Sequence, residues 1–283
     1  MRSLAALIGA LLITACGPTD RVGSTIDAAG SGSGSGSDGQ VVIPPTSRVF
    51  AHSGGTLFRV DASTYAPAMV GDMKLNGAVL PQSITDIAID IDDRMLGVTL
   101  DKLYEIDETT GAVTLVTSLP AAAQGFQSLS FVPDPADDTK DIMIAANFDG
   151  DVYKIDTTNG AATKIGSYGT VANGVVKSSG DIIGVRGFGN YATVKIGNDM
   201  TQDYLAKIDA ANGFKATPLG TGTGFKDIFG LAFWEGTIFG FVAGTNGGNI
   251  VKIDPNTGAG TEVQGGSVRW YGAGVATDAP ILQ

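Results

Sequence analysis

The sequence of 283 residues contains a single cysteine, Cys16, and a single histidine, His52. One cysteine excludes a disulfide within the chain, and one histidine excludes a histidine-rich metal centre. The longest apolar run of the leader, residues 4–13, is roughly half the ~20 residues that a membrane-spanning helix needs. Gly-Xaa-Ser-Xaa-Gly motifs, phosphate-binding loops and zinc-ligand spacings are also absent. The sequence therefore contains no direct sign of catalysis.

Basic side chains are scarce, with 18 lysines and arginines against 29 aspartates and glutamates and a net charge of −11. Because a surface that binds nucleic acid has to be basic to contact phosphates, we expect no nucleic-acid partner. Only four of the acidic residues are glutamates: Glu105, Glu108, Glu235 and Glu262. Most of the charge is therefore aspartate, which is common in turns, and the 41 glycines add to a turn-rich composition.

The first residues have the pattern of an export signal. Arg2 precedes the apolar run, and Ile13-Thr14-Ala15-Cys16 follows it. This ending resembles the lipobox of bacterial lipoproteins, in which the cysteine is lipidated and becomes the amino terminus after cleavage. The resemblance implies a signal peptide over 1–15, a lipid on Cys16 and a place in the cell envelope. Gly17, in the next position, implies the outer membrane of a Gram-negative host. A chance cysteine near an ordinary cleavage site is the alternative.

A low-complexity segment follows the cysteine. Residues 30–37 alternate glycine and serine, a composition typical of flexible linkers, and Pro44-Pro45 ends the segment. We therefore predict a linker over 16–45 and one folded domain over 46–283, attached to the membrane through the lipid alone.

A five-residue pattern recurs five times in the predicted domain. Its copies are residues 57–61, 103–107, 152–156, 205–209 and 250–254. The aspartates that end the copies are 46, 49, 53 and 45 residues apart, and the two chain ends together supply a further 45 residues. A four-stranded propeller blade takes about 40–50 residues. The spacing therefore predicts an all-β, five-bladed β-propeller with four-stranded antiparallel blades.

Each copy predicts a β-hairpin. Its aspartate can accept hydrogen bonds from turn amides, and a glycine four residues later can adopt the positive φ that ends the turn. Four copies have this glycine: Gly111, Gly160, Gly213 and Gly258. The first copy has Thr64-Tyr65 there instead, so we expect its turn to differ in type.

Runs of β-prone residues between the copies predict the other strands of each blade. In the fourth blade we expect strands over 174–177 and 182–185, followed by a long connection over 187–203. The last run, 271–276, has no hairpin after it. We predict that it pairs with 49–51 and closes the ring with both chain ends in one sheet.

The repeat unit, LYxIDxxTGxxTxIG, resembles the repeats of bacterial quinoprotein-like and other secreted β-propellers, and it covers most of residues 46–283. Quinone-dependent members carry Lys and Trp after the glycine, where this chain has Ala-Val, Ala-Ala, Phe-Lys and Ala-Gly. The resemblance therefore implies the fold and no quinone cofactor.

The candidate ligand-binding residues lie where the chain leads into the inner strands, because functional residues concentrate on loops held by a rigid scaffold. They are Asp86, Gln127, Asn173, Asp227, Arg269, Trp270 and Tyr271, together with Tyr191 from the long connection. Trp270 and Tyr271 are suited to stack on a sugar or a peptide. Closing the seam between the chain ends is their alternative role.

Acidic turns are predicted at the other end of the ring, at 90–93 and 134–138. Carboxylate clusters can bind calcium, but neither has the glycine and terminal glutamate of an EF-hand loop. We therefore favour solvated turns and assign no metal ligand, and calcium is the only cofactor that the sequence admits. His52 precedes Gly54-Gly55 and is predicted to be an exposed turn residue.

These observations favour a surface-displayed, monomeric binding module for a protein or polysaccharide partner, without catalysis. A lectin-like binder of carbohydrates or small ligands is the first alternative, although the candidate loops differ from blade to blade. An envelope hydrolase, either a glycosidase or a lactonase, is the second. It requires a pair of carboxylates or a metal at the mouth of the central channel.

Overall fold

The computed structural model describes residues 48–121 and 125–281. Within these ranges the chain forms β-strands and one short 3₁₀ helix, η2 (Ala210–Asn212), which confirms the predicted all-β class. The strands form five sheets. Cys16, the signal peptide over 1–15, the linker over 16–45 and both bounds of the predicted domain, 46 and 283, lie outside the described residues and stay predictions.

Each sheet is one blade, and its strands follow one another from the inner to the outer edge. The first blade is β23 (Gly272–Gly274), β1 (Val49–His52), β2 (Thr56–Val60) and β3 (Pro67–Asp72). The second is β6 (Asp86–Ile89), β7 (Met95–Val98), β8 (Lys102–Ile106) and β9 (Val113–Ser118), extended by β4 (Lys74–Leu75) and β5 (Ala78–Val79). The third is β10 (Ser128–Asp134), β11 (Asp137–Ala146), β12 (Asp151–Ile155) and β13 (Ala162–Ser167). The fourth is β15 (Gly174–Val185), β16 (Gly189–Ile196), β17 (Tyr204–Asp209) and β18 (Lys215–Pro218), with β14 (Thr170–Val171) beside β15. The fifth is β19 (Ile228–Trp234), β20 (Thr237–Val242), β21 (Asn249–Ile253) and β22 (Gly260–Gly265).

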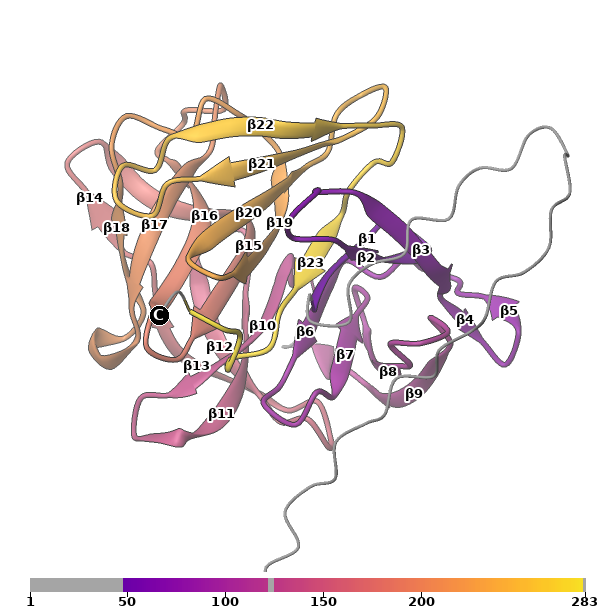
Figure 1. Ribbon diagram of the computed structural model, residues 1–283. Helices are drawn as coiled ribbons and strands as arrows, with labels where there is room; N and C mark the ends of the chain where they lie inside the picture. Colours follow the sequence, from indigo (N-terminus) through magenta and orange to yellow (C-terminus); the bar gives the residue numbers. More distant parts are fainter. Residues whose placement is uncertain (1–47, 122–124, 282–283) are drawn as a thin grey trace, which may run out of the picture. The chain divides into compact units, whose positions relative to one another are not determined.

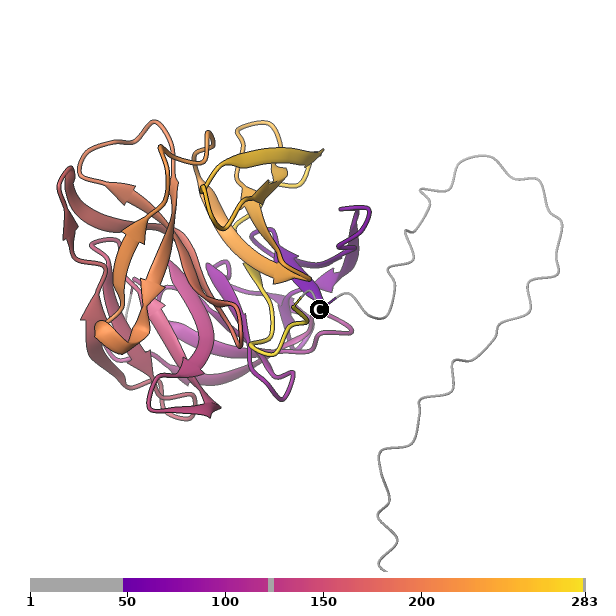
Figure 2. The same cartoon turned by 60° about the vertical axis from the view of Figure 1, so that its left-hand side comes forward.

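The blades form a ring. Each inner strand contacts the inner strands of both neighbouring blades, in the order β6, β10, β15, β19, β23 and back to β6 (Figure 1). In the view of Figure 2, the colours of successive blades follow one another around the same centre. This arrangement is the five-bladed β-propeller that the repeat spacing predicts.

The first and the last strand of the described chain meet in the first blade. β23 pairs with β1 in antiparallel register, and His52 lies opposite Gly272. Trp270, which is 2% exposed, packs at this seam with its ring 5.4 Å from those of Phe58 and Phe241. The predicted closure of the ring is therefore confirmed.

The turns between third and fourth strands have the predicted geometry. In the second blade, Asp107 Oδ1 accepts hydrogen bonds from the amides of Thr109 at 2.8 Å and Thr110 at 3.0 Å, and Gly111 has a φ of 75°. The same aspartate contacts recur at Asp61, Asp156 and Asp254, whereas Asp209 caps η2 and accepts from the Asn212 amide at 3.2 Å. We name the end of the ring that carries these turns the hairpin face, and the end where the inner strands begin the opposite face.

The first blade has the same turn as the second, third and fifth, so the prediction that its turn would differ is wrong. Tyr65 adopts a φ of 63°, and its amide donates to the Asp61 carbonyl as that of Gly111 donates in the second blade. A positive φ costs a non-glycine residue about 1 kcal/mol. Packing offsets this cost, because the Tyr65 ring lies 6.1 Å from that of Phe239 in the fifth blade.

The fourth blade also differs from its prediction. Residues 174–185 form one inner strand, β15, and residues 189–196, expected in a long loop, form the second strand, β16. A bulge between Ser178 and Ile182 interrupts the pairing of these two strands. The polar sequence over 178–181 is typical of a turn, but its side chains are buried and hydrogen-bonded near the centre of the ring.

Hydrophobic side chains fill the space between neighbouring blades. The backbones approach closely where glycine leaves room. A Cβ atom at Gly71 of β3 would lie 2.0 Å from the Thr110 carbonyl oxygen, and one at Gly166 of β13 would lie 2.1 Å from that of Gly213. The outer strand of one blade is thus packed against the hairpin turn of the next.

Candidate functional site

Two aspartates meet at the centre of the ring, near the opposite face. Asp86 is the first residue of β6, and Asp181 lies in the bulged part of β15. They are 0% and 1% exposed, and their carboxyl groups are hydrogen-bonded to each other. Ser128 and Gly272 hold the corresponding first positions of β10 and β23. The pair therefore connects the second blade with the fourth across the axis.

Main-chain amides hold both carboxyl groups in place. In each aspartate, one oxygen accepts from the amide of the next residue and the other from an amide of the neighbouring blade. The distances are 2.9 Å to Ile87 and 2.8 Å to Leu129 for Asp86, and 2.6 Å to Ile182 and 2.7 Å to Leu231 for Asp181. Amides of four of the five inner strands therefore fix the acid pair, which cannot turn without breaking these hydrogen bonds.

Burial raises the pKa of both acids well above the usual range of aspartate, and the charge of Asp86 raises that of Asp181 further. Two carboxyl groups in hydrogen-bond contact repel each other strongly when both are ionised. The hydrogen bond between them requires a proton on at least one of the two, so the pair carries at most one negative charge. The surrounding amides stabilise the negative charge that remains.

His52 lies beside the pair, and it is fully buried, so its predicted place in an exposed turn is wrong. The strand β1 continues through it because it pairs with Gly272. Its Nδ1 atom lies 2.7 Å from the Ser53 carbonyl oxygen, whereas Nε2 has no hydrogen-bond partner among the described residues. Burial lowers its pKa to about 4, so the ring is neutral at pH 7.

Glycine is required where the histidine approaches the acid pair. A Cβ atom at Gly272 would lie 2.3 Å from Asp86 Oδ1 and 2.5 Å from His52 Nε2. Any larger residue would push the two side chains apart, because real Cβ contacts at such distances do not occur.

A buried ion pair follows the bulge of β15. Lys195 Nζ lies 2.6 Å from Asp203 Oδ1, and the two side chains are 6% and 0% exposed. Ser179 Oγ donates to the same oxygen at 2.5 Å, and the Ile228 amide donates to the other at 2.8 Å. These contacts join the fourth blade to the fifth, so the polar residues of the bulge serve the fold.

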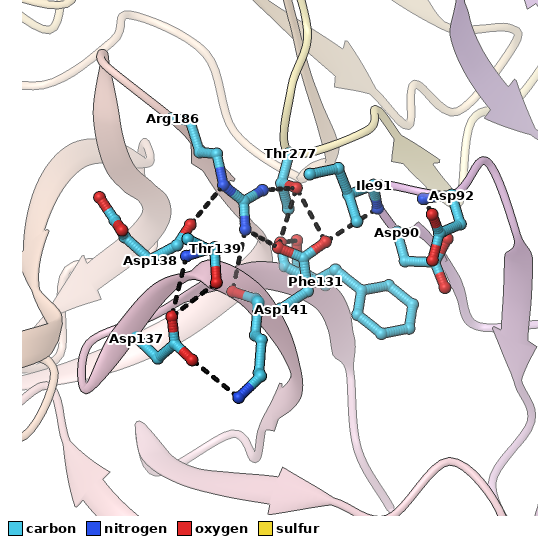
Figure 3. Close-up of polar contacts among 12 residues, drawn as sticks. Asp90, Ile91, Asp92, Phe131, Asp137, Asp138, Thr139, Asp141, Arg186 and Thr277 are labelled. Atoms are coloured by element: carbon cyan, nitrogen blue, oxygen red, sulfur yellow. Dashed lines mark hydrogen bonds and ion pairs between the residues drawn. The ribbon is translucent and has the colours of Figure 1, made fainter. Parts of the chain in front are cut away.

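Arg186 lies in the turn between the first two strands of the fourth blade, on the hairpin face, and Figure 3 shows its contacts. From the turn between β15 and β16, its guanidinium donates to Asp141 at 2.7 Å, to the Thr277 hydroxyl and to two main-chain carbonyls of the third blade. Asp141 also accepts from the Ile91 amide at 2.8 Å. The cluster therefore joins the first four blades at one point.

The segment after β23 runs past the same end of the axis. The amide of Arg186 donates to the Thr277 carbonyl at 2.7 Å, and that of Glu235, in the turn of the fifth blade, donates to the Pro280 carbonyl at 2.8 Å. Most of residues 275–279 are buried there. The central axis is therefore covered on the hairpin face and filled by the acid pair near the opposite face.

A groove opens beside the arginine cluster, along the side of the third blade that faces the second. Its volume is about 720 Å³. Asp90 and Asp92, from the turn between β6 and β7, line one wall, and Lys154, Asp156 and Thr163 line the other. The apolar side chains of Phe131, Met143 and Ile155, which are 1–5% exposed, lie beneath it, and the half-buried Ile91 and the exposed Ala161 also line it. We name this hollow the hairpin-face groove.

Three of the predicted ligand-binding residues are buried. Asp86 belongs to the acid pair, and Trp270 packs the seam, which is the alternative role that the sequence leaves open. Tyr191 lies within β16 rather than in a loop, with its ring 5.2 Å from that of Phe188. Its predicted loop position is wrong because the fourth blade has its second strand there.

The other predicted residues lie at the opposite face and do not form one site. Gln127, Asn173 and Arg269 are exposed, whereas Asp227 and Tyr271 are half-buried. The Arg269 guanidinium lies 5.4 Å from the Tyr271 ring. These positions are spread over four blades, because the start of each inner strand contributes its own loop.

Asp181, Asp141 and Arg186 are not among the residues predicted from the sequence. A signal for the first was present, since Asp-Ile occurs both at 86–87 and at 181–182, in two inner strands. Asp141 and Arg186 are 45 residues apart and have no such shared pattern. Their contact depends on how far the turns of two blades extend over the axis.

Metal binding by three or more side chains has no support in the described part of the chain. There, no three or more His, Cys, Asp or Glu side chains are placed to hold a metal ion. In the two acidic turns, Asp90 and Asp134 accept hydrogen bonds from the amides of Asp92 and Ala136, as expected for turn residues. Calcium binding at these turns stays a prediction.

Comparison with known protein families gives no match, and no curated protein matches the sequence. A chain of a nidogen–laminin complex is 10% identical over 82% of this chain and 98% of that one, with a TM-score of 0.51. A structural genomics protein of Bacteroides thetaiotaomicron is 16% identical over 69% and 53%, with a TM-score of 0.44. TolB from Acinetobacter baumannii is 16% identical over 80% and 55%, with a TM-score of 0.47. This chain thus spans about half the length of the last two, and the likeness to the first supports the fold alone.

Proposed function

We propose that this protein is a binding module of the cell envelope that holds a partner protein on its hairpin face. The hairpin-face groove carries this proposal. Its volume of about 720 Å³ lies within the range of about 300–1,000 Å³ that is typical of binding sites. Turns held by a closed ring of blades form its walls, and binding residues are commonly found on such turns.

The acid pair on the axis supports catalysis less well than the groove supports binding. A hydrolase needs its acids in contact with the substrate, whereas Asp86 and Asp181 are buried and each of their oxygens already accepts a main-chain hydrogen bond. The alternative of a glycosidase also requires two carboxyl groups roughly 5–10 Å apart, on either side of the bond to be cleaved, whereas these two are in hydrogen-bond contact. Asp181→Asn separates the two functions, because it would abolish hydrolysis at the axis and leave a partner in the groove bound.

A lectin-like role on the opposite face is the weaker alternative. It needs several polar and aromatic groups around one ligand. Gln127, Asn173 and Asp227 belong to three different blades, and Trp270 has no exposed face for a sugar ring. A glycan array without signal would remove this alternative.

Attachment to the envelope through Cys16 is part of the proposal. The described residues contain no helix that is long and apolar enough to cross a membrane. Lipidation would therefore supply the anchor. Metabolic labelling with a radioactive fatty acid should label the wild-type protein and leave Cys16→Ser unlabelled. Equal labelling of both proteins would refute the anchor without affecting the propeller.

Photo-crosslinking tests the binding role. A benzoylphenylalanine at the exposed position 163, on the wall of the groove, should crosslink a partner in cells that produce the protein. The same residue at position 175, an exposed position of β15 near the opposite face, is the matched control. If both positions yield the same crosslinked species, or if position 163 yields none, the groove does not hold a partner.

A further inference from the structure

We propose that the hairpin-face groove recognises an extended protein segment that carries lysine or arginine side chains. This inference rests on the proposed function and names the chemistry of the partner. It follows from the charges of the groove, from its rigidity and from its apolar floor.

The charge of the groove is unbalanced. Of its five aspartates only Asp141 lies in an ion pair among the described residues, with Arg186. Of its two lysines, Lys140 pairs with Asp137 outside the groove. The carboxylates without a cation within 4 Å are Asp90, Asp92, Asp134 and Asp156, and they face the single remaining cation, Lys154. A basic guest would therefore relieve repulsion as well as gain attraction.

The repulsion is visible at the most buried of these carboxylates. Burial raises the pKa of Asp90, and the negative charges of Asp92 and Asp141 raise it further. A cationic group placed among the three would reverse this effect, since it favours the ionised form of each. An anionic or neutral guest offers no such gain, so the charge selects the sign of the partner.

The walls of the groove are held in position before any partner arrives. Asp141 accepts the Ile91 amide at 2.8 Å, which fixes the turn of the second blade against the third. Arg186 and Thr277 hold Asp141 from the other side, as Figure 3 shows. A site that is already ordered loses little entropy on binding, so a modest number of contacts can give useful affinity.

The floor suits the stem of a long basic side chain. The half-buried Ile91 and the exposed Ala161 line it between the acidic walls, above the buried side chains of Phe131, Met143 and Ile155. Lysine and arginine bury their methylene groups on apolar surface while the charged end stays among polar groups. A small inorganic cation would use the carboxylates and leave this floor unused. The combination therefore favours a peptide over a metal ion.

Binding of short peptides tests the inference. The probes are N-acetylated hexalysine amide and hexaglutamate amide, added to the purified full-length protein with labelled methionine methyl groups. Hexalysine should shift the NMR signal of Met143, which is buried beneath the groove, and leave that of Met200, which is 57% exposed in the fourth blade, unchanged. Hexaglutamate should shift neither signal.

Two double variants with the same change in charge supply the control. Asp90→Asn with Asp92→Asn should weaken hexalysine binding about tenfold, as expected for the loss of two close charge pairs. Asp209→Asn with Asp254→Asn, in hairpin turns outside the groove, should weaken it less than about twofold. Asparagine is chosen because its oxygen can keep the turn hydrogen bonds.

Equal weakening by both double variants, or equal shifts of Met143 and Met200, would overturn the inference and indicate attraction by net charge alone. If position 163 still crosslinks a partner while hexalysine does not bind, the binding role stands and the basic chemistry is wrong. If hexalysine binds as expected and no partner is crosslinked, the groove has the inferred chemistry and the proposed function fails.

Discussion

Replacing Asp181 by asparagine should change how the stability of the protein depends on pH. Asparagine has the shape of a protonated aspartate, and its amide group can donate to Asp86 as the shared proton does. The variant thus keeps the hydrogen bond between the second and fourth blades and removes the need to take up a proton on folding. The difference in unfolding free energy between variant and wild type isolates this effect, because other titrating groups are common to both.

The size of the effect follows from linkage. A buried acid whose pKa is raised binds more protons in the native state than in the unfolded state, where the pKa of aspartate is about 3.9. For each proton that the pair retains, its contribution to the stability of the wild type therefore falls by about 1.4 kcal/mol per pH unit above pH ~4, until the raised native pKa is passed. Relative to wild type, Asp181→Asn should gain stability with that slope.

His52 has the opposite effect on the pH dependence of stability, and it masks the effect of the acid pair over part of the pH range. Its pKa is lowered from 6.5 to about 4, so the unfolded state binds the extra proton between these values. This contributes stability above pH 6.5 that is lost as the pH falls towards 4, by about 3 kcal/mol in total. From pH 4 to 6.5 the two slopes cancel in the wild type. His52→Gln should therefore expose the falling slope, and Asp181→Asn the rising one.

Urea denaturation at half-unit steps from pH 4.5 to 8, followed by circular dichroism, measures both slopes. Asp107→Asn, at an exposed hairpin turn, is the control and should run parallel to the wild type above pH 5. If Asp181→Asn also runs parallel to the wild type over the whole range, the pair does not share a proton in the native state. The reasoning about the axis would then be wrong.

Four further substitutions test the packing of the ring by urea denaturation. Arg186→Ala should cost about 3 kcal/mol, since it leaves the nearly buried Asp141 carboxylate unpaired, and a cost under ~1 kcal/mol would contradict its role as a link between blades. Gly213→Ala should lower the free energy of unfolding by about 1 kcal/mol for its positive φ alone. Gly111→Ala should lower it clearly more, because its Cβ would also lie 2.8 Å from the Gly71 carbonyl oxygen of the first blade. Equal losses would count against the close approach of the two blades. Trp270→Ala should cost about 3–5 kcal/mol at the seam, and a much smaller loss would show that the closure does not depend on this ring.

Most of the fold was predictable because each blade repeats the same local chemistry. An aspartate that accepts turn amides, followed by a residue with positive φ, fixes the hairpin of every blade, and the spacing of these aspartates fixes the number of blades. The prediction failed where polar residues served a distant contact. Residues 178–181 have the composition of a turn, yet they are buried because Asp181 reaches Asp86 across the ring.

The candidate site was less predictable for the same reason. Loop composition identified Asp86 and the exposed residues of the opposite face, but not which side chains would meet. His52 and Asp181 are 129 positions apart in the sequence and lie near the same acid, Asp86. Such contacts depend on the register of three inner strands, and a shift of one residue would turn each side chain away from the axis.

The two polar clusters on the axis also bear on where function can lie. A five-bladed ring leaves a narrow centre, and in this protein Asp86, Asp181 and Arg186 fill it with groups that hydrogen-bond from blade to blade. Each group that joins blades is a group withdrawn from ligands, because its donors or acceptors are already satisfied. Recognition is then left to surfaces beside the axis, where side chains remain unpaired. The groove between the second and third blades meets this condition, since Asp92 and Lys154 line it without an ion-pair partner among the described residues.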